Sequence, residues 1–167
     1  QNTAGKPVAS MIKHSQINWG VEIDIDKGIP LSSGLGGSAA SAVAAVVAMN
    51  CLLGDRYSDK ELLDFALDGE EIASGARHPD NVAPALYGGL VACLQDGTVH
   101  PLIIPNGIFC LLIYPDIEIN TKDARDILKK EITHQDWLTQ SSYLLGFMTG
   151  IANKNKELIF ENLKDII

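Results

Sequence analysis

Apolar and polar residues alternate near the start of the chain. Between Ile17 and Asp26, the last six positions alternate strictly: Val21, Glu22, Ile23, Asp24, Ile25 and Asp26. A period of two is typical of a strand with one buried face. The pattern predicts a strand over Ile17–Asp26, followed by a loop over Lys27–Gly37 that is rich in glycine and serine.

Two helical patterns follow this loop. Ser38–Leu53 is apolar nearly all round and ends before Gly54, which predicts a helix buried in the centre of the fold. Ser58 and Glu61 have the spacing of a capping box, so a second helix is expected from Ser58 to about Ile72. The apolar stripe of this second helix consists of Leu62, Leu63, Phe65, Ala66 and Leu67.

The rest of the chain places strands before helices. A loop is expected over Ser74–Pro79 and a short helix over Asn81–Leu86. Three runs resemble strands, the first two forming a hairpin around Gly97: Gly89–Leu94, Val99–Ile104 and Ile108–Tyr114. Helices are expected over Thr121 to about Lys129, Trp137–Ala152 and Lys156–Leu163. Segregated strands and helices indicate the α+β class.

Composition narrows the classes of function. The chain has 167 residues, 46% of them hydrophobic, a net charge of −8 and a pI of about 4.8. This is typical of a globular protein and argues against nucleic-acid or anionic-membrane partners. Cys51, Cys93 and Cys110 lie in apolar runs, which predicts buried free thiols in a reducing compartment, and the cytoplasm is therefore expected.

The most informative segment is Pro30–Ala40, which joins the expected strand to the apolar helix. Glycines allow a close approach of the backbone to a ligand, and the start of the helix favours an anion. Six small residues supply this flexibility and hydroxyl donors: Ser32, Ser33, Gly34, Gly36, Gly37 and Ser38. The segment is neither a Walker A loop nor a dinucleotide fingerprint. It predicts a phosphate site, and the alternative is a flexible connection.

Pro30–Ala40 resembles the second signature motif of the GHMP kinases, a superfamily that includes galactokinases, homoserine kinases and mevalonate kinases. Gly37 stands where serine is commonest, which removes a hydroxyl but keeps the backbone donors. The resemblance implies that this segment wraps the phosphates of ATP. The residues implied are Pro30, Leu31, Ser32, Ser33, Gly34, Leu35, Gly36, Gly37, Ser38, Ala39 and Ala40.

A second segment, His78–Pro84, has the sequence HPDNVAP and resembles the signature of homoserine kinases. The resemblance implies that His78, Asp80 and Asn81 bind an amino-acid acceptor. It also implies that Ser38 and Glu70 share a magnesium ion. Taken alone, Glu70 and its neighbour at the helix end would be read as a solvated surface, and the HPDN run as a turn.

Further likenesses are shorter. Pro115–Arg125 resembles the family's P-x-x-x-x-x-T-x-x-A-R segment, so Thr121 and Arg125 are expected to bind the acceptor, with Arg125 on its carboxylate. Asn2 and Lys27 stand where the family places nucleotide contacts near adenine. The resemblance identifies no catalytic base, and Asp80 is the one candidate.

The implied fold is GHMP kinase-like α+β. A ribosomal-protein-S5-domain-2-like N-terminal part runs into a ferredoxin-like C-terminal part, both truncated. Residues 1–105 would form part of the nucleotide-binding domain, and residues 106–167 the start of the C-terminal domain. Because the resemblance covers only the middle of the family's length, we expect a central fragment that is catalytically inert alone.

The implied reaction transfers the γ-phosphoryl group of ATP, with Mg²⁺, to the hydroxyl of L-homoserine, giving O-phospho-L-homoserine in threonine biosynthesis. A homodimer is an open expectation. One alternative is another GHMP kinase that acts on mevalonate or a sugar. Others are a non-catalytic nucleotide-binding regulatory domain and a purely structural α+β domain.

Overall fold

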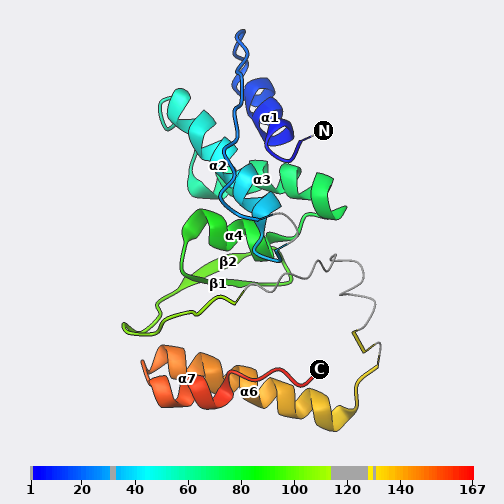
Figure 1. Cartoon of the computed structure of the whole chain (residues 1–167), viewed down its shortest axis with the longest axis vertical. Coiled ribbons are helices and arrows are strands. Elements are labelled where there is room, and N and C mark those ends of the chain that lie inside the picture. Colours follow the sequence, from blue (N-terminus) through cyan, green and yellow to red (C-terminus); the bar gives the residue numbers. More distant parts are fainter. Residues whose placement is uncertain (1, 31–32, 114–127, 130) are drawn as a thin grey trace. The chain divides into compact units, whose positions relative to one another are not determined.

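The computed structural model describes residues 2–30, 33–113, 128–129 and 131–167 (Figure 1). The chain divides into two compact units, Gln1–Pro101 and Leu102–Ile167. Each unit has its own packing and is described by itself. The expected domain boundary between residues 105 and 106 stays a prediction.

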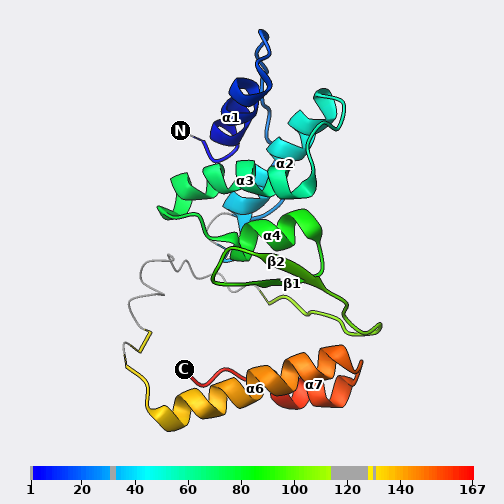
Figure 2. The ribbon, with the colours of Figure 1, turned by 180° about the vertical axis from the view of Figure 1, so that it is seen from behind.

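The first unit contains four helices and a hairpin in its described residues. They are α1 (Gly5–Ser15), α2 (Gly37–Leu52), α3 (Asp59–Ser74), α4 (Pro79–Tyr87), β1 (Leu90–Cys93) and β2 (Val99–Leu102), the last residue of which begins the second unit. Helices α1, α2 and α3 pack against one another, and α4 contacts α2, α3 and β1. Figure 2 shows the same order of elements from behind.

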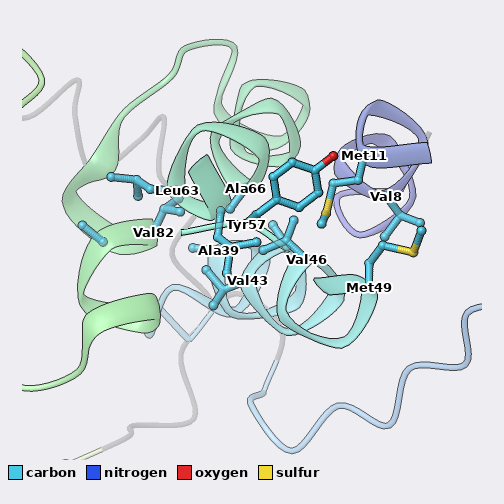
Figure 3. Packing of buried hydrophobic residues seen from close by; sticks show 13 residues of the cluster. Val8, Met11, Ala39, Val43, Val46, Met49, Tyr57, Leu63, Ala66 and Val82 are labelled. Carbon is cyan, nitrogen blue, oxygen red and sulfur yellow. The ribbon is translucent and has the colours of Figure 1, made fainter. Parts of the chain in front are cut away.

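The core of this unit lies between α1, α2, α3 and α4 (Figure 3). Met11, Val46 and Val82 are fully buried and come from three different helices. Tyr57 closes one side of the core. Its backbone N–H donates to Asn50 Oδ1 at 2.9 Å, and its backbone carbonyl accepts from Asn50 Nδ2 at 3.2 Å. The Tyr57 hydroxyl lies 2.6 Å from Ser15 Oγ, which ties α1 to the same corner.

The beginning of α3 confirms the predicted capping box. The Glu61 carboxylate accepts from the Ser58 backbone N–H at 2.9 Å and from the Ser58 hydroxyl at 2.7 Å. These two hydrogen bonds lower the pKa of Glu61, the backbone bond more than the hydroxyl bond. Helix α4 begins differently, with Pro79 at its first position, where the missing N–H costs nothing.

The predicted hairpin is also confirmed, because β1 and β2 form a two-stranded sheet. Gly97 adopts φ +82° in the turn and donates its N–H to the Leu94 carbonyl at 3.0 Å. The turn depends on a glycine because this left-handed backbone is unfavourable for residues with a β-carbon.

Two expected strands are absent from the part of the chain that the structure describes. Ile17–Asp26 is irregular, with Ile23 and Ile25 exposed, so that prediction is wrong. Residues 108–113 are likewise irregular, and the Phe109 side chain is 91% exposed. The physical reason is the same in both cases: a strand needs a hydrogen-bonded partner, and alternation within one segment does not supply it. Tyr114 lies outside the described residues.

Three other expectations differ from the structure. Helix α1 was missed, although Val8, Met11 and Ser15 share the three- and four-residue spacing of a buried stripe. Cys51 and Cys110 are free but exposed, and Cys93 is half-buried, so burial of all three thiols is wrong. Helix α2 is buried on one face only, because apolar residues on its other face, such as Val47, are exposed in this unit.

The second unit contains α6 (His134–Ala152) and α7 (Lys156–Asn162), which pack against each other. Both predicted helices are confirmed, and α6 begins earlier than expected because Thr133 caps it. The Thr133 hydroxyl accepts from the Asp136 N–H at 3.0 Å. The helix expected from Thr121 lies almost wholly outside the described residues, and the ferredoxin-like C-terminal part stays a prediction. None of the described helices has the length and apolar character that crossing a bilayer requires.

Candidate functional site

The glycine-rich segment leads directly into the first turn of α2. Gly34 and Gly36 adopt φ +71° and +65°, and Gly36 occupies the N-cap position of α2. The first amides of a helix have no partner within it, and the helix dipole favours an anion beside them. The geometry therefore suits a phosphate group. Leu31 and Ser32 lie outside the described residues.

The two residues expected to share magnesium are brought together. The Ser38 hydroxyl donates to Glu70 Oε2 at 3.3 Å, across 32 positions of sequence. Glu70 is only 6% exposed, whereas Glu71 is exposed and pairs with Lys6 at 2.8 Å. Magnesium prefers hard oxygen ligands and takes one or two carboxylates beside phosphate oxygens. A hydroxyl and a buried carboxylate next to a helix start that suits a phosphate group fit such an ion.

Gly69 positions this carboxylate, and the sequence pattern did not single it out. A β-carbon added at Gly69 would overlap the backbone oxygen of Thr3 and lie 2.9 Å from the β-carbon of Ala42. The same β-carbon would lie 3.3 Å from Pro7 Cγ of α1, so helices α1, α2 and α3 meet at Gly69, immediately before Glu70. Glycine is intrinsically unfavourable in the interior of a helix. Its presence at position 69 was therefore the sequence signal for a close approach of neighbouring elements.

The glycine loop also contacts the HPDN segment. A β-carbon added at Gly36 would lie 3.1 Å from Asn81 Oδ1 and 3.4 Å from Asn81 Cβ. Asn81 lies in the first turn of α4, and Val82 and Ala83 after it are fully buried. The buried pair fixes α4 on the core, so the exposed His78 and Asp80 stand on an anchored helix start.

A shallow groove of about 550 Å³ continues from this contact. Its floor is apolar and comes from one face each of α2 and α4, including Val43, Val47 and Pro84. Gly36 and Asn81 line it where it meets the loop. A small molecule lying there would have its polar end beside the start of α2.

Lys27 lies on the other side of the loop. A β-carbon added at Gly37 would lie 3.3 Å from Lys27 Cε and 3.5 Å from Lys27 Nζ. The ammonium group thus stands over the first turn of α2, and the absence of a side chain at Gly37 leaves room for it. This position is beside the expected phosphate loop, and the predicted adenine contact stays a prediction.

Asn2 has a local role in the structure. Its side-chain oxygen accepts from the Ala4 N–H at 2.9 Å, and its backbone carbonyl accepts from the Gly5 N–H at 3.1 Å. Both bonds order the start of α1. The nucleotide contact expected of Asn2 stays a prediction.

The remaining candidate groups are a cysteine thiol, two residues expected to bind the acceptor, and clusters that could bind a metal ion. Burial, and secondarily the charge of Asp80, raise the pKa of the Cys93 thiol. Thr121 and Arg125 lie outside the described residues. Within the described ranges, no three His, Cys, Asp or Glu side chains gather as a metal site.

Comparison with known families now adds to this geometry. The model of the GHMP kinases N terminal domain matches residues 2–89, which include the glycine loop, Glu70 and the HPDN segment. The chain belongs to the GHMP kinase family. The match also covers helix α1, which the sequence pattern alone did not reveal.

Individual relatives agree along the whole chain. A homoserine kinase of Xylella fastidiosa (strain M12) is 43% identical over 167 residues, which are 100% of this chain and 52% of that protein. A homoserine kinase of Xanthomonas campestris pv. campestris (strain B100) is 40% identical, with the same coverage. The chain spans about half the length of these curated relatives.

A solved structure agrees as well. The crystal structure of homoserine kinase from Cytophaga hutchinsonii is 38% identical and superposes with a TM-score of 0.91. The superposition covers 99% of this chain and 53% of that one. The fold of the described residues is thus that of the corresponding part of a GHMP kinase.

Proposed function

We propose that this chain forms part of a homoserine kinase, which transfers the γ-phosphoryl group of ATP to the hydroxyl of L-homoserine. The products would be ADP and O-phospho-L-homoserine, an intermediate on the way to threonine, and we expect the reaction in the cytoplasm. The proposal is carried by one observation: the contact between Gly36 of the glycine loop and Asn81 of the HPDN segment. Relatives that match this chain over its whole length bear the name homoserine kinase.

The proposed chemistry consists mainly of positioning. The amides at the start of α2 and the Lys27 ammonium would bind phosphate oxygens, because both present positive charge at one place. Ser38 and Glu70 would hold Mg²⁺, which when bound neutralises charge on the phosphates. His78, Asp80 and Asn81 would orient the acceptor, so that its hydroxyl approaches in line. Asp80 is the candidate for accepting the hydroxyl proton, and Thr121 and Arg125 are proposed to complete the acceptor site.

The proposal is tested by measuring ADP release with Mg-ATP and a panel of acceptors. The panel contains L-homoserine, L-serine, L-threonine, mevalonate and galactose. The longest natural polypeptide that contains these residues is used, since the relatives are about twice as long. Turnover on L-homoserine alone is expected. Preference for mevalonate or galactose would contradict homoserine as the acceptor and indicate another GHMP kinase activity. ATP binding without turnover would favour a regulatory domain.

The role of Lys27 is tested with a matched pair of variants. Lys27→Gln removes the charge over the first turn of α2, and Lys13→Gln removes an exposed charge from α1. Lys27→Gln is expected to raise KM for ATP about 10-fold, as for the loss of one charged hydrogen bond. Equal values for the two variants would exclude Lys27 from the phosphate site.

A further inference from the structure

Arg77 lies immediately before the HPDN segment and binds backward onto α3. Its Nη1 forms an ion pair with Asp68 Oδ1, and its Nη2 donates to the Asp64 carbonyl at 3.0 Å. The bonds span nine and 13 positions of sequence. They are possible because Gly75 ends α3 with φ +78° and turns the chain back along the helix.

Asp68 is held from a second side. Its other oxygen, Oδ2, accepts from the Ser10 hydroxyl of α1 at 2.8 Å. Its side chain is 24% exposed, against 42% for that of Arg77. One carboxylate therefore joins α1, α3 and the segment that leads to α4. Two bonds in different directions fix a guanidinium more firmly than a single contact does.

The segment Gly75–His78 is thus fixed at both ends. Arg77 ties it to α3, and the buried Val82 and Ala83 tie the helix after it to the core. His78 and Asp80, the proposed acceptor-binding residues, lie between these two attachments. An exposed ion pair contributes little to global stability. We therefore expect the Arg77–Asp68 pair mainly to fix the position of Gly75–His78.

We propose that Arg77 is a positioning residue for the amino-acid acceptor. By binding Asp68 and the Asp64 carbonyl, it holds His78 and Asp80 at a constant distance from the glycine loop. The identity of the acceptor rests on the proposed kinase function, but the positioning of Gly75–His78 by Arg77 does not. It assigns no contact between Arg77 and substrate.

The test compares Arg77→Gln with Lys6→Gln. Lys6 pairs with Glu71 at 2.8 Å and joins α1 to α3, and its side chain is similarly exposed, but both partners of this pair lie outside Gly75–His78. Arg77→Gln is expected to lower kcat/KM for L-homoserine about 10-fold, mainly through KM, because a displaced binding group costs at least that much. KM for ATP and the melting temperature should stay near the wild-type values. Arg77→Lys should give an intermediate KM, since lysine keeps the charge but lacks the two-pronged geometry.

An acceptor KM no higher in Arg77→Gln than in Lys6→Gln, or an equal rise in KM for ATP, would overturn the inference. The rate of hydrogen exchange at residues 75–81 tests the positioning role of Arg77 independently of the proposed function. If the wild type phosphorylates no acceptor, the proposed function fails, yet faster exchange in Arg77→Gln alone still supports the positioning role. Unchanged exchange in that variant overturns the role whatever the substrate is.

Discussion

Glu70 is a buried carboxylate at the C-terminal end of α3, where the helix dipole disfavours negative charge. Its hydrogen bond from Ser38 offsets part of that cost, and a magnesium ion would offset more. A carboxylate kept at an unfavourable place has a functional reason more often than an exposed one does. Its neighbour Glu71, exposed and paired with Lys6, needs no such reason.

We therefore predict that Glu70→Gln lowers kcat/KM for Mg-ATP at least about 10-fold, the range found when metal sites lose a supporting group. The variant keeps the shape of the side chain and removes its charge. Glu71→Gln is the matched control and should stay within about 2-fold of the wild type, because surface pairs contribute little. Steady-state kinetics at several Mg²⁺ concentrations measure both. Equal losses in the two variants would contradict a metal role specific to Glu70.

How far the site could be predicted differs from residue to residue. A phosphate site at Gly34–Ser38 could be predicted from residue types alone, because the start of a helix that follows glycines favours an anion, and it stays a prediction. The pairing of Ser38 with Glu70 came from family likeness, since no local pattern relates positions that far apart. The contact of Gly36 with Asn81 and the reach of Arg77 to Asp68 depend on tertiary packing, and sequence reasoning did not foresee them.

At the scale of elements, helices with local sequence signals were predicted correctly, whereas two strands that have no partner in the described residues were predicted wrongly. Ser58 and Glu61 set the start of α3 through bonds within one turn. Ile17–Asp26 has the period of a strand, but its pairing would need a segment elsewhere. Helix α1 was not predicted, although Pro7 lies in its first turn, where proline suits a helix.

The capping box gives α3 a dependence on pH. The Ser58 bonds hold the pKa of Glu61 below its ordinary value of 4.5, so folding favours the charged form. The stabilisation is present above the unfolded-state pKa and is lost as pH falls through the lowered folded-state pKa. We predict that wild type and Glu61→Gln differ in unfolding free energy at neutral pH and converge as the pH falls through the lowered pKa of Glu61.

Urea unfolding at a series of pH values measures this difference. Ser58→Ala is the control variant, because it removes the hydroxyl donor and with it the helix cap. It should lower the free energy of unfolding by about 1 kcal/mol at neutral pH. A gap between wild type and Glu61→Gln that widens at low pH would contradict the assigned sign.

The junction of α1, α2 and α3 at Gly69 leads to a separate prediction. Gly69→Ala should lower the unfolding free energy by about 3 kcal/mol, the upper range for overpacking, because its methyl group would meet the Thr3 backbone oxygen. Gly5→Ala is the control: apart from its chain neighbours and the backbone of its own helix, no atom lies within 4 Å of the added β-carbon, so it should be neutral or slightly stabilising. Denaturant midpoints compare the two, and similar values would show that the junction relaxes freely.

At the scale of the whole chain, burial is concentrated in the first unit. The main hydrophobic cluster runs from Val8 to Ala83 and lies entirely in that unit. In the described residues of the second unit, Ile151 and Ile159 are the buried hydrophobic side chains, while Leu144 and Leu145 on α6 are 60% and 69% exposed. Since apolar burial is the main stabilising contribution, the two units should differ in stability.

We predict that the second unit unfolds first, and that Mg-ATP stabilises only the first. The glycine loop, Ser38 and Glu70 all belong to the first unit. A ligand at 100 times its dissociation constant that binds only the folded form adds about 2.7 kcal/mol. Hydrogen exchange should therefore slow in α2 and α3 when Mg-ATP is added, and stay unchanged in α6 and α7. Equal slowing in all four helices would show instead that the units unfold as one cooperative body, and nucleotide binding would then stabilise the chain as a whole.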